Sequence, residues 1–314
     1  MAGTAEAAVA ATAAADPAAA TDPAAAAAAS TPVRRRRRAG HALAYATLAL
    51  GVLVFAFPIW IALVGSTHDA GTLGRGEVPL LPGPHGPENY AAAWSRGAGR
   101  MQIAPAWLML LNSAVMATLI AAGKIAISLV SAFAVVYFRF PGRLAAFWLI
   151  FVTLMLPVEV RLIPTFQVVV GLGLTDSMAG LTIPLIASAT ATLLFRGFFL
   201  TIPDELAEAA RMDGAGPLRF LRDVVLPLSR NSVAALFVIL FIYGWNQYLW
   251  PLLIVTDRSL ETIVVGLGKS LGAGDAQNEW NTIMATAVMA LLPPVLVVVL
   301  MQRWFVRGLT ETEK

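Results

Sequence analysis

Six long apolar stretches constrain this chain more than any other feature of its sequence. They lie near residues 43–64, 107–133, 144–166, 179–200, 232–255 and 283–302. Each is long enough to cross a bilayer, because a membrane-spanning helix needs roughly 20 mostly apolar residues. Prolines interrupt some of the stretches, which membrane helices tolerate when neighbouring groups satisfy the freed carbonyls. The sequence therefore predicts an all-α integral membrane protein with six transmembrane helices.

Composition agrees with this fold class and excludes several kinds of chemistry. Charged residues make up only 13% of the chain and hydrophobic residues 58%, whereas ordinary globular chains have roughly 25% charged residues. So few charges could not cover the surface of a soluble protein of this size. The chain has no cysteine, which excludes disulfides, thiolate metal sites and cysteine nucleophiles. We expect no cofactor and no metal in this chain.

The distribution of positive charge predicts the orientation. If the amino terminus is inside, 15 of the 22 lysines and arginines fall in cytoplasmic segments, six fall in outer segments, and Lys124 lies within a span. Membrane proteins carry an excess of lysine and arginine in their cytoplasmic loops. We therefore expect both termini to be cytoplasmic, since the opposite topology would invert every loop.

The first forty residues differ in composition from the rest. Residues 1–33 are nearly all alanine, and Arg34–Arg38 form a run of five arginines. Low complexity predicts a disordered tail over residues 1–40, with the membrane domain covering residues 41–314. The arginine run is consistent with a nucleic-acid patch or with the cytoplasmic flank of the first span. We favour the flank and expect no nucleic-acid partner.

The segment between the fourth and fifth apolar stretches carries helix start and stop signals. Thr201, followed three positions later by Asp204, predicts a capping box. Gly214 and Gly216 are expected to end this helix, and a second short helix can start at Pro217. The pattern predicts a short helix–turn–helix along the membrane surface. It is consistent with a docking surface for a partner or with an amphipathic linker.

The same segment resembles the coupling loop of the permease subunits of ATP-binding-cassette (ABC) importers. It contains Glu208-Ala209-Ala210, three residues, Gly214, nine residues, Val224, one residue, and Leu226-Pro227. The resemblance implies a coupling helix that docks on a separate ATP-hydrolysing subunit, so that this chain is not itself an enzyme. The residues it assigns to this contact are Glu205, Glu208, Ala209, Ala210, Asp213, Gly214, Ala215, Val224, Leu226 and Pro227.

Further segments extend the resemblance over about residues 41–314. Ser131–Ala134 and Phe138–Arg143 are similar to the carbohydrate-uptake branch of these permeases, and Thr153–Arg161, Ala187–Thr192 and Tyr243–Leu253 to the second permease subunits of glycerol-3-phosphate importers. The resemblance implies a bacterial inner-membrane protein, surrounded by lipid, that pairs with a homologous permease. Two copies of an ATP-binding subunit and a periplasmic substrate-binding protein would complete the complex. It also implies sn-glycerol-3-phosphate or glycerophosphodiesters as substrate, with a neutral sugar or oligosaccharide as the alternative.

Polar side chains within the apolar stretches are candidates for substrate contacts, because ionisable groups within a membrane are costly and tend to be functional. Lys124 could bind phosphate or pair with a carbonyl or carboxylate of a neighbouring helix. Arg161 could fork onto phosphate oxygens or snorkel to the outer interface. The fifth stretch carries a cluster that could line a polyol path or form interhelical hydrogen bonds and an aromatic belt. Its members are Trp245, Asn246, Gln247, Tyr248 and Trp250.

Other functional classes lack their signatures. A secondary transporter would show repeated halves around a coupling-ion site, and the sequence has no internal repeat. An intramembrane enzyme would need a catalytic constellation, which is missing. Gly268-Lys269-Ser270 resembles the end of a phosphate-binding P-loop, but Ile263 stands where the first glycine is required.

Overall fold

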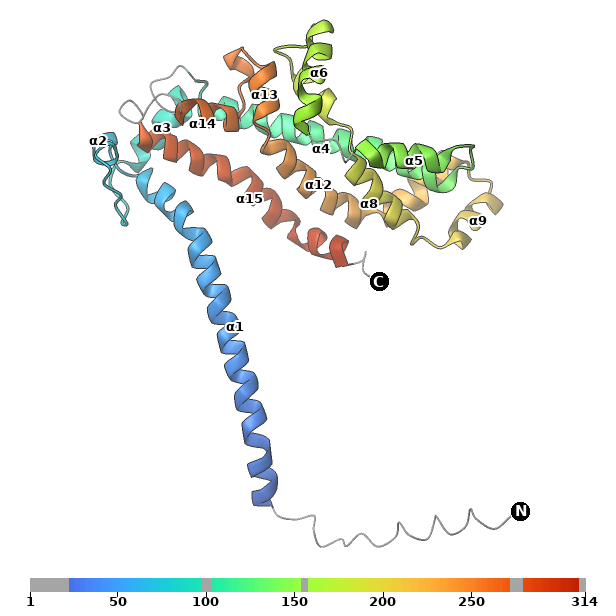
Figure 1. Ribbon diagram of the computed structural model, residues 1–314, viewed down its shortest axis with the longest axis horizontal. Helices are drawn as coiled ribbons and strands as arrows, with labels where there is room; N and C mark the ends of the chain where they lie inside the picture. The colour runs from blue at the N-terminus through green and yellow to red at the C-terminus, as the bar shows by residue number, and fades with distance from the viewer. Residues whose placement is uncertain (1–22, 98–102, 154–157, 272–278, 311–314) are drawn as a thin grey trace. The chain divides into compact units, whose positions relative to one another are not determined.

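A computed structural model describes residues 23–97, 103–153, 158–271 and 279–310 (Figure 1). All regular secondary structure in these ranges is helical. The elements are α1 (Pro23–Gly65), α2 (Ala70–Gly74), α3 (Gly86–Arg96), α4 (Ala106–Tyr137), α5 (Arg143–Val152), α6 (Val158–Gly171), α7 (Met178–Thr182), η3 (Ile183–Leu185), α8 (Ala189–Phe199), α9 (Asp204–Met212), α10 (Pro217–Phe220), η4 (Leu221–Val225), α11 (Leu226–Leu228), α12 (Arg230–Trp245), α13 (Leu249–Ile254), η5 (Arg258–Leu260), α14 (Ile263–Leu271) and α15 (Trp280–Thr310).

The chain divides into two units, Met1–Pro58 and Ile59–Lys314. The described part of the first unit is helix α1 from Pro23 onward. Residues 1–22 of the tail expected over residues 1–40 lie outside the described ranges, so disorder of that tail stays a prediction. Alanine has the highest helix propensity of all residues and arginine also ranks high, which favours a helix from Pro23 onward.

Three of the predicted spans are single long helices. Residues 44–65 of α1, the whole of α4, and residues 280–303 of α15 are each long and apolar enough to cross a membrane. Large apolar side chains such as Leu149 on α5 and Leu300 on α15 remain exposed within the chain. Exposed apolar surface of this kind fits contact with lipid or with another membrane subunit.

The other three predicted spans are interrupted, and Pro157, Pro184 and Pro251 lie within these stretches. The stretch at 144–166 is divided between α5 and α6, with residues 154–157 outside the described ranges. The stretch at 179–200 is a pair of helical segments bent by 50° between η3 and α8. The stretch at 232–255 ends its first helix at Trp245, and residues 246–248 separate it from α13.

Local chemistry accounts for the interruption before α8. Pro184 lies in η3 and cannot donate a backbone hydrogen bond. Ser188 then starts a new helix, because its hydroxyl oxygen accepts from the amide of Ala191 at 3.3 Å. The Ser128 hydroxyl of α4 donates to the Ser188 carbonyl at 3.0 Å. The break is therefore held by a contact with a different helix.

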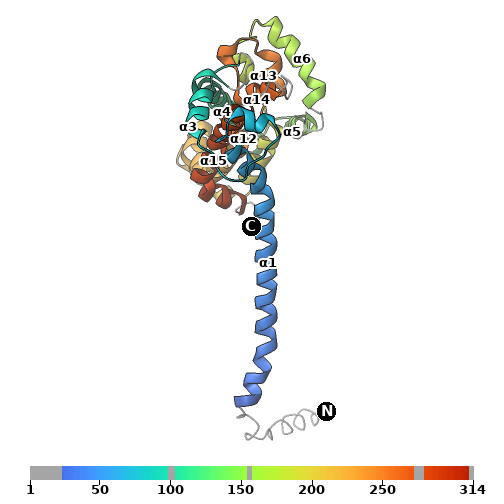
Figure 2. The same cartoon turned by 90° about the vertical axis from the view of Figure 1, so that its left-hand side faces the viewer.

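Within the second unit, α12 packs against both α4 and α15, and α4 also packs against α8 (Figures 1 and 2). The contact between α12 and α4 is close at Gly244. A Cβ atom placed on Gly244 would lie 2.8 Å from the Cα of Ala117. Only glycine therefore permits this approach of the two helices.

A buried amide joins three elements of the second unit. The Asn89 side chain on α3 donates to the carbonyls of Ser66 at 2.9 Å and His68 at 2.8 Å. Its own oxygen accepts from the Asn281 amide on α15 at 2.7 Å. The segment after α1, helix α3 and helix α15 are thus linked through one side chain.

The loop before α14 is fixed by a second buried group. The Glu261 carboxylate is only 2% exposed and accepts from the Lys269 ammonium at 2.8 Å and from the Ala104 amide at 2.9 Å. The Asn112 amide of α4 donates to the Glu261 carbonyl at 3.0 Å. The P-loop-like sequence around Lys269 therefore contributes to an ion pair that secures the loop.

Candidate functional site

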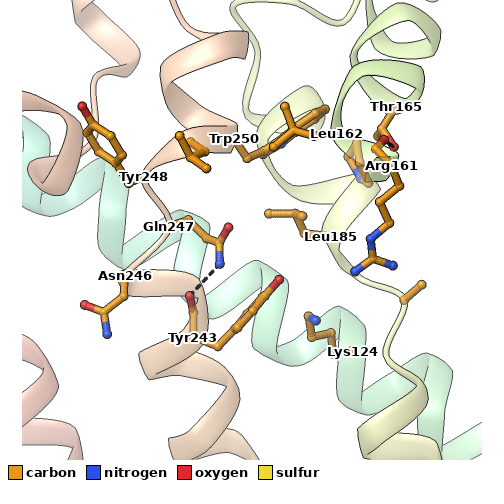
Figure 3. Close-up of a pocket in the computed structure, with 13 residues that line it drawn as sticks. Lys124, Arg161, Leu162, Thr165, Leu185, Tyr243, Asn246, Gln247, Tyr248 and Trp250 are labelled. Carbon is orange, nitrogen blue, oxygen red and sulfur yellow. Dashed lines mark hydrogen bonds between the residues drawn. The ribbon is translucent and has the colours of Figure 1, made fainter. Parts of the chain in front are cut away.

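A cavity of about 400 Å³ opens among α4, α6, η3 and the break between α12 and α13 (Figure 3). Two cations, amides and aromatic rings share its wall with aliphatic groups. The lining residues are Lys124, Arg161, Leu162, Thr165, Pro184, Leu185, Ala187, Tyr243, Asn246, Gln247, Tyr248, Leu249 and Trp250.

Lys124 is the more buried of the two cations. It lies on α4 with 7% of its surface exposed. Its Nζ atom lies 4.2 Å from the centroid of the Tyr243 ring on α12. Within the described residues it makes no ion pair with a carboxylate and no hydrogen bond to a carbonyl. The described residues therefore contain no carbonyl or carboxylate that pairs with Lys124, as the alternative interpretation would require.

Arg161 reaches the same cavity from α6. The residue is exposed, and Figure 3 shows its guanidinium extending past Leu185 toward Lys124. A guanidinium presents several donors in a planar fork that matches phosphate oxygens. Two cations from different helices thus face one cavity, and no described carboxylate lines it.

The amide and aromatic groups come from the break that ends α12. The Gln247 amide nitrogen donates to the Tyr243 carbonyl at 3.1 Å, one turn earlier in the chain (Figure 3). The Trp250 indole donates to the Gly180 carbonyl at 3.1 Å, which ties α13 to α7. The interruption of the helix therefore brings polar side chains to the wall of the cavity.

Six of the seven predicted substrate-pathway residues line this cavity, and Trp245 does not. Its ring is buried and stacks on Phe241, with ring centroids 5.8 Å apart. Tyr243 lines the cavity and was missed by the sequence analysis. Tyr243 lies three and four residues before Asn246 and Gln247, a spacing that places side chains on one helical face, and this spacing could have identified it.

A second cavity of about 520 Å³ adjoins the first and shares four lining residues with it, Lys124, Arg161, Ala187 and Tyr243. The remaining lining residues are Ile127, Ser131, Ile150, Thr153, Ser188, Ala189, Thr190, Thr192, Ile239 and Leu240. None of the described residues that line it carries a carboxylate.

The predicted coupling segment contains helix α9, most of whose residues are exposed, while Ala207 and Ala210 pack against the core. The end of α9 is a Schellman motif, in which Gly214 has a φ of 72°. The Gly214 amide donates to the Arg211 carbonyl at 3.0 Å, and the Ala215 amide to the Ala210 carbonyl at 2.9 Å. Glycine is the residue that adopts this left-handed conformation without strain. The expected stop signal at Gly214 is confirmed.

The expected capping box at the start of α9 is wrong. The residue before the helix is Pro203, which makes no side-chain capping bond. The Thr201 hydroxyl instead donates to the Phe198 carbonyl at 2.7 Å. Because α9 starts at Asp204 with Pro203 at its cap position, Thr201 lies two residues before the cap, and its hydroxyl instead satisfies a carbonyl at the end of α8.

The ten residues assigned to the coupling contact are all at least partly accessible. Ala210, Ala215 and Val224 are half-buried, and the others, Glu205, Glu208, Ala209, Asp213, Gly214, Leu226 and Pro227, are exposed. Short helix α10 follows, and the Phe220 ring at its end packs against Tyr137 of α4, with centroids 5.1 Å apart. The chain then continues through the π-helical turn η4 and α11 into α12.

The family of binding-protein-dependent transport system inner membrane components matches residues 124–311, from the buried lysine to the end of α15. The chain belongs to this family. The permease is therefore a multi-pass protein of the inner membrane and a transport subunit.

Relatives of the permease are similar over nearly their whole length. It is 57% identical over 272 residues to the sn-glycerol-3-phosphate transport system permease protein UgpE of Agrobacterium fabrum (strain C58 / ATCC 33970), covering 87% of this chain and 96% of that protein. It is 55% identical over 267 residues to the protein of the same name from Yersinia pestis bv. Antiqua (strain Antiqua), covering 85% and 95%.

A solved structure supports the fold. A chain from the crystal structure of a bacterial ABC transporter involved in the import of the acidic polysaccharide alginate matches with a TM-score of 0.75. The two chains are 23% identical, and the match covers 86% of the permease and 98% of that chain.

Proposed function

We propose that the permease is one of two membrane subunits of an ABC importer and that its substrate is sn-glycerol-3-phosphate or a glycerophosphodiester. The observation that carries this proposal is the pair of cations, Lys124 and Arg161, on a cavity that no described carboxylate lines. Lys124 is buried and Arg161 is exposed on the same cavity, and a cation buried within a membrane protein without a described carboxylate partner favours an anionic ligand. The names of the relatives point to the same substrate class.

The complex we propose has further subunits and a defined topology. A homologous permease completes the pathway, two ATP-binding subunits hydrolyse ATP, and a periplasmic binding protein delivers the substrate. This chain contributes six spans and no cofactor, counting the broken helices α5–α6, α7–α8 and α12–α13 as one span each. Both termini are cytoplasmic, as the lysine and arginine distribution favours.

Helix α9 is the coupling helix in this proposal. It is exposed, ends in a well-defined turn, and leads through α10 and η4 into α12. Phe220 links this path to the cytoplasmic end of α4 through Tyr137. A movement of α9 would therefore reach the two helices that carry Lys124 and Tyr243.

The test is ATP hydrolysis by the complete complex in proteoliposomes, with the binding protein loaded in turn with glycerol-3-phosphate, glycerophosphocholine or maltose. We expect a phosphorylated glycerol to stimulate hydrolysis. Glu208→Lys should abolish the stimulation, because it reverses a charge at the docking surface. Glu88→Lys is the matched control, since Glu88 is also exposed but lies on α3, outside the coupling segment.

Each part of the proposal has its own refutation. Stimulation by maltose alone would refute the substrate assignment and leave the transport function intact. Unchanged stimulation in Glu208→Lys would refute the role of α9.

A further inference from the structure

The two cavities adjoin at Lys124, Arg161, Ala187 and Tyr243, the four residues that line both, and we call this junction the neck. The first cavity extends from the neck to the α12–α13 break, and the second extends to the start of α8 and the middle of α12. A substrate that moved through this chain from one cavity to the other would pass these four side chains. Two of them are cations, and the other two are an aromatic ring and a methyl group.

The ammonium of Lys124 is held at this neck by the face of an aromatic ring. Its Nζ lies 4.2 Å from the Tyr243 centroid, within the distance at which a cation is attracted by a ring face. The residue is buried, and among the described residues its ammonium donates a hydrogen bond to no oxygen acceptor. A buried ammonium without hydrogen bonds is costly, so an anion at the neck would gain donors that the described part of the chain leaves unused.

Tyr243 is itself well fixed. Its carbonyl accepts from the Gln247 amide, and the next residue, Gly244, lies at the close contact of α12 with Ala117 on α4. The ring therefore comes from a helix whose distance to α4 is set by direct packing. Since Lys124 lies on α4, the same packing sets the distance between the ring and the ammonium.

We propose that Tyr243 is a positioning residue that holds the Lys124 ammonium at the neck, where Lys124 and Arg161 together bind the phosphate of the substrate as it passes between the cavities. This inference rests on the proposed function. It adds the place where the phosphate binds and the residue, Tyr243, that positions the Lys124 ammonium there. The ring acts through its face, so the phenol hydroxyl is dispensable.

The second cavity continues the favourable surface for an anion. Ser188, Ala189 and Thr190, at the cap and first turn of α8, line it. A helix amino terminus carries partial positive charge and free amide donors. A phosphate that leaves the two cations therefore meets a further region of positive potential rather than a carboxylate.

The first test compares Tyr243→Phe with Tyr243→Leu in the complete complex. Phenylalanine keeps the ring face, whereas leucine keeps only an apolar group. With the binding protein saturated with glycerol-3-phosphate, we expect wild-type transport rates for Tyr243→Phe. For Tyr243→Leu we expect the transport rate to fall about 5-fold to 30-fold, which corresponds to about 1–2 kcal/mol for a buried cation–π contact. Equal rates for the two variants would overturn the proposal.

The second test separates positioning from packing. Lys124→Met removes the charge at similar length, and we expect it to slow transport at least as much as Tyr243→Leu. In the Lys124→Met background, Tyr243→Leu should lower the transport rate by less than about a further 2-fold, because Tyr243 acts through the Lys124 ammonium. A full additional loss in the double variant would show a structural role and overturn the proposal.

Failure of the proposed function is distinguishable from failure of this inference. If the wild-type complex does not transport glycerol-3-phosphate but transports another loaded substrate, the proposed function fails. If the wild type transports it and Lys124→Met does so at the same rate, the function stands and the phosphate site at the neck is wrong. Assembly of each variant complex is checked by size-exclusion chromatography before transport is measured.

Discussion

Replacement of Gly244 by alanine tests whether close packing of α12 on α4 supports the site. The added Cβ would lie 2.8 Å from the Cα of Ala117, whereas ordinary van der Waals contact begins at 3.4 Å. The obstructing atom belongs to the backbone, so no side-chain rotation relieves the contact. The two helices must separate by roughly 0.6 Å, the difference of those two distances, and overpacking of this kind costs about 1–3 kcal/mol.

The gain in helix propensity acts in the opposite direction. Alanine is favoured over glycine in a helix by about 1 kcal/mol. Because the clash involves two backbones, we place its cost in the upper half of the range and expect a net loss of about 1–2 kcal/mol. For a chain of this size that corresponds to a decrease of roughly 2–8 °C in the unfolding midpoint.

The assay is thermal unfolding of the purified complex, followed by tryptophan fluorescence. Gly197→Ala is the control, since Gly197 also lies within a helix and a Cβ atom there would meet nothing within 4 Å. We expect its midpoint to equal or exceed that of the wild type. If Gly244→Ala is as stable as Gly197→Ala, the argument that close packing fixes α12 against α4 is refuted.

Three further substitutions test contacts away from the two cavities. Lys269→Met leaves the buried Glu261 carboxylate with its backbone donor alone and should lower stability by about 1–2 kcal/mol, a value reduced because the ammonium is partly exposed. Adding Glu261→Gln should recover part of the lost unfolding midpoint, and a further decrease of the midpoint would contradict this. Asn89→Leu keeps similar volume but removes two buried hydrogen bonds and one part-buried one, so we expect a loss of about 2–3 kcal/mol. An unchanged unfolding midpoint would count against the role of this link. Hydrogen bonds, first of all from the Thr256 hydroxyl and then from backbone amides, hold the pKa of Asp176 below its usual value, so the stabilisation that its carboxylate provides is present at neutral pH and lost as the pH falls through that lowered pKa. The unfolding midpoints of the wild type and Asp176→Asn should therefore converge under acid conditions, and a difference that stays constant with pH would contradict the argument.

Much of the architecture was accessible from the sequence because it depends on local composition. Apolar stretches long enough to span a bilayer identified α1, α4 and α15 directly. The glycine at position 214 marked the end of α9, since a left-handed residue there favours glycine whatever surrounds it. Predictions of this kind depend on a single segment of the chain and not on its contacts with a second helix.

The breaks within the remaining spans were not accessible in this way. A hydropathy window cannot show that Ser128 on α4 donates to the Ser188 carbonyl at the start of α8. The capping box failed for a related reason. The capping box requires Thr201 at the cap position of α9, but α8 extends to Phe199 and α9 begins only at Asp204, which leaves Pro203 at the cap and Thr201 two residues before it.

The residue pattern is sufficient to identify a membrane permease and to locate two cations within its apolar stretches. The packing of the helices is needed to show that Lys124 and Arg161 share a cavity and that Tyr243, rather than Trp245, is the aromatic neighbour of Lys124. Residues two apart on a helix lie roughly 200° apart around its axis. Which of them faces the cavity therefore depends on how α12 packs against α4, a contact between segments that are far apart in the chain.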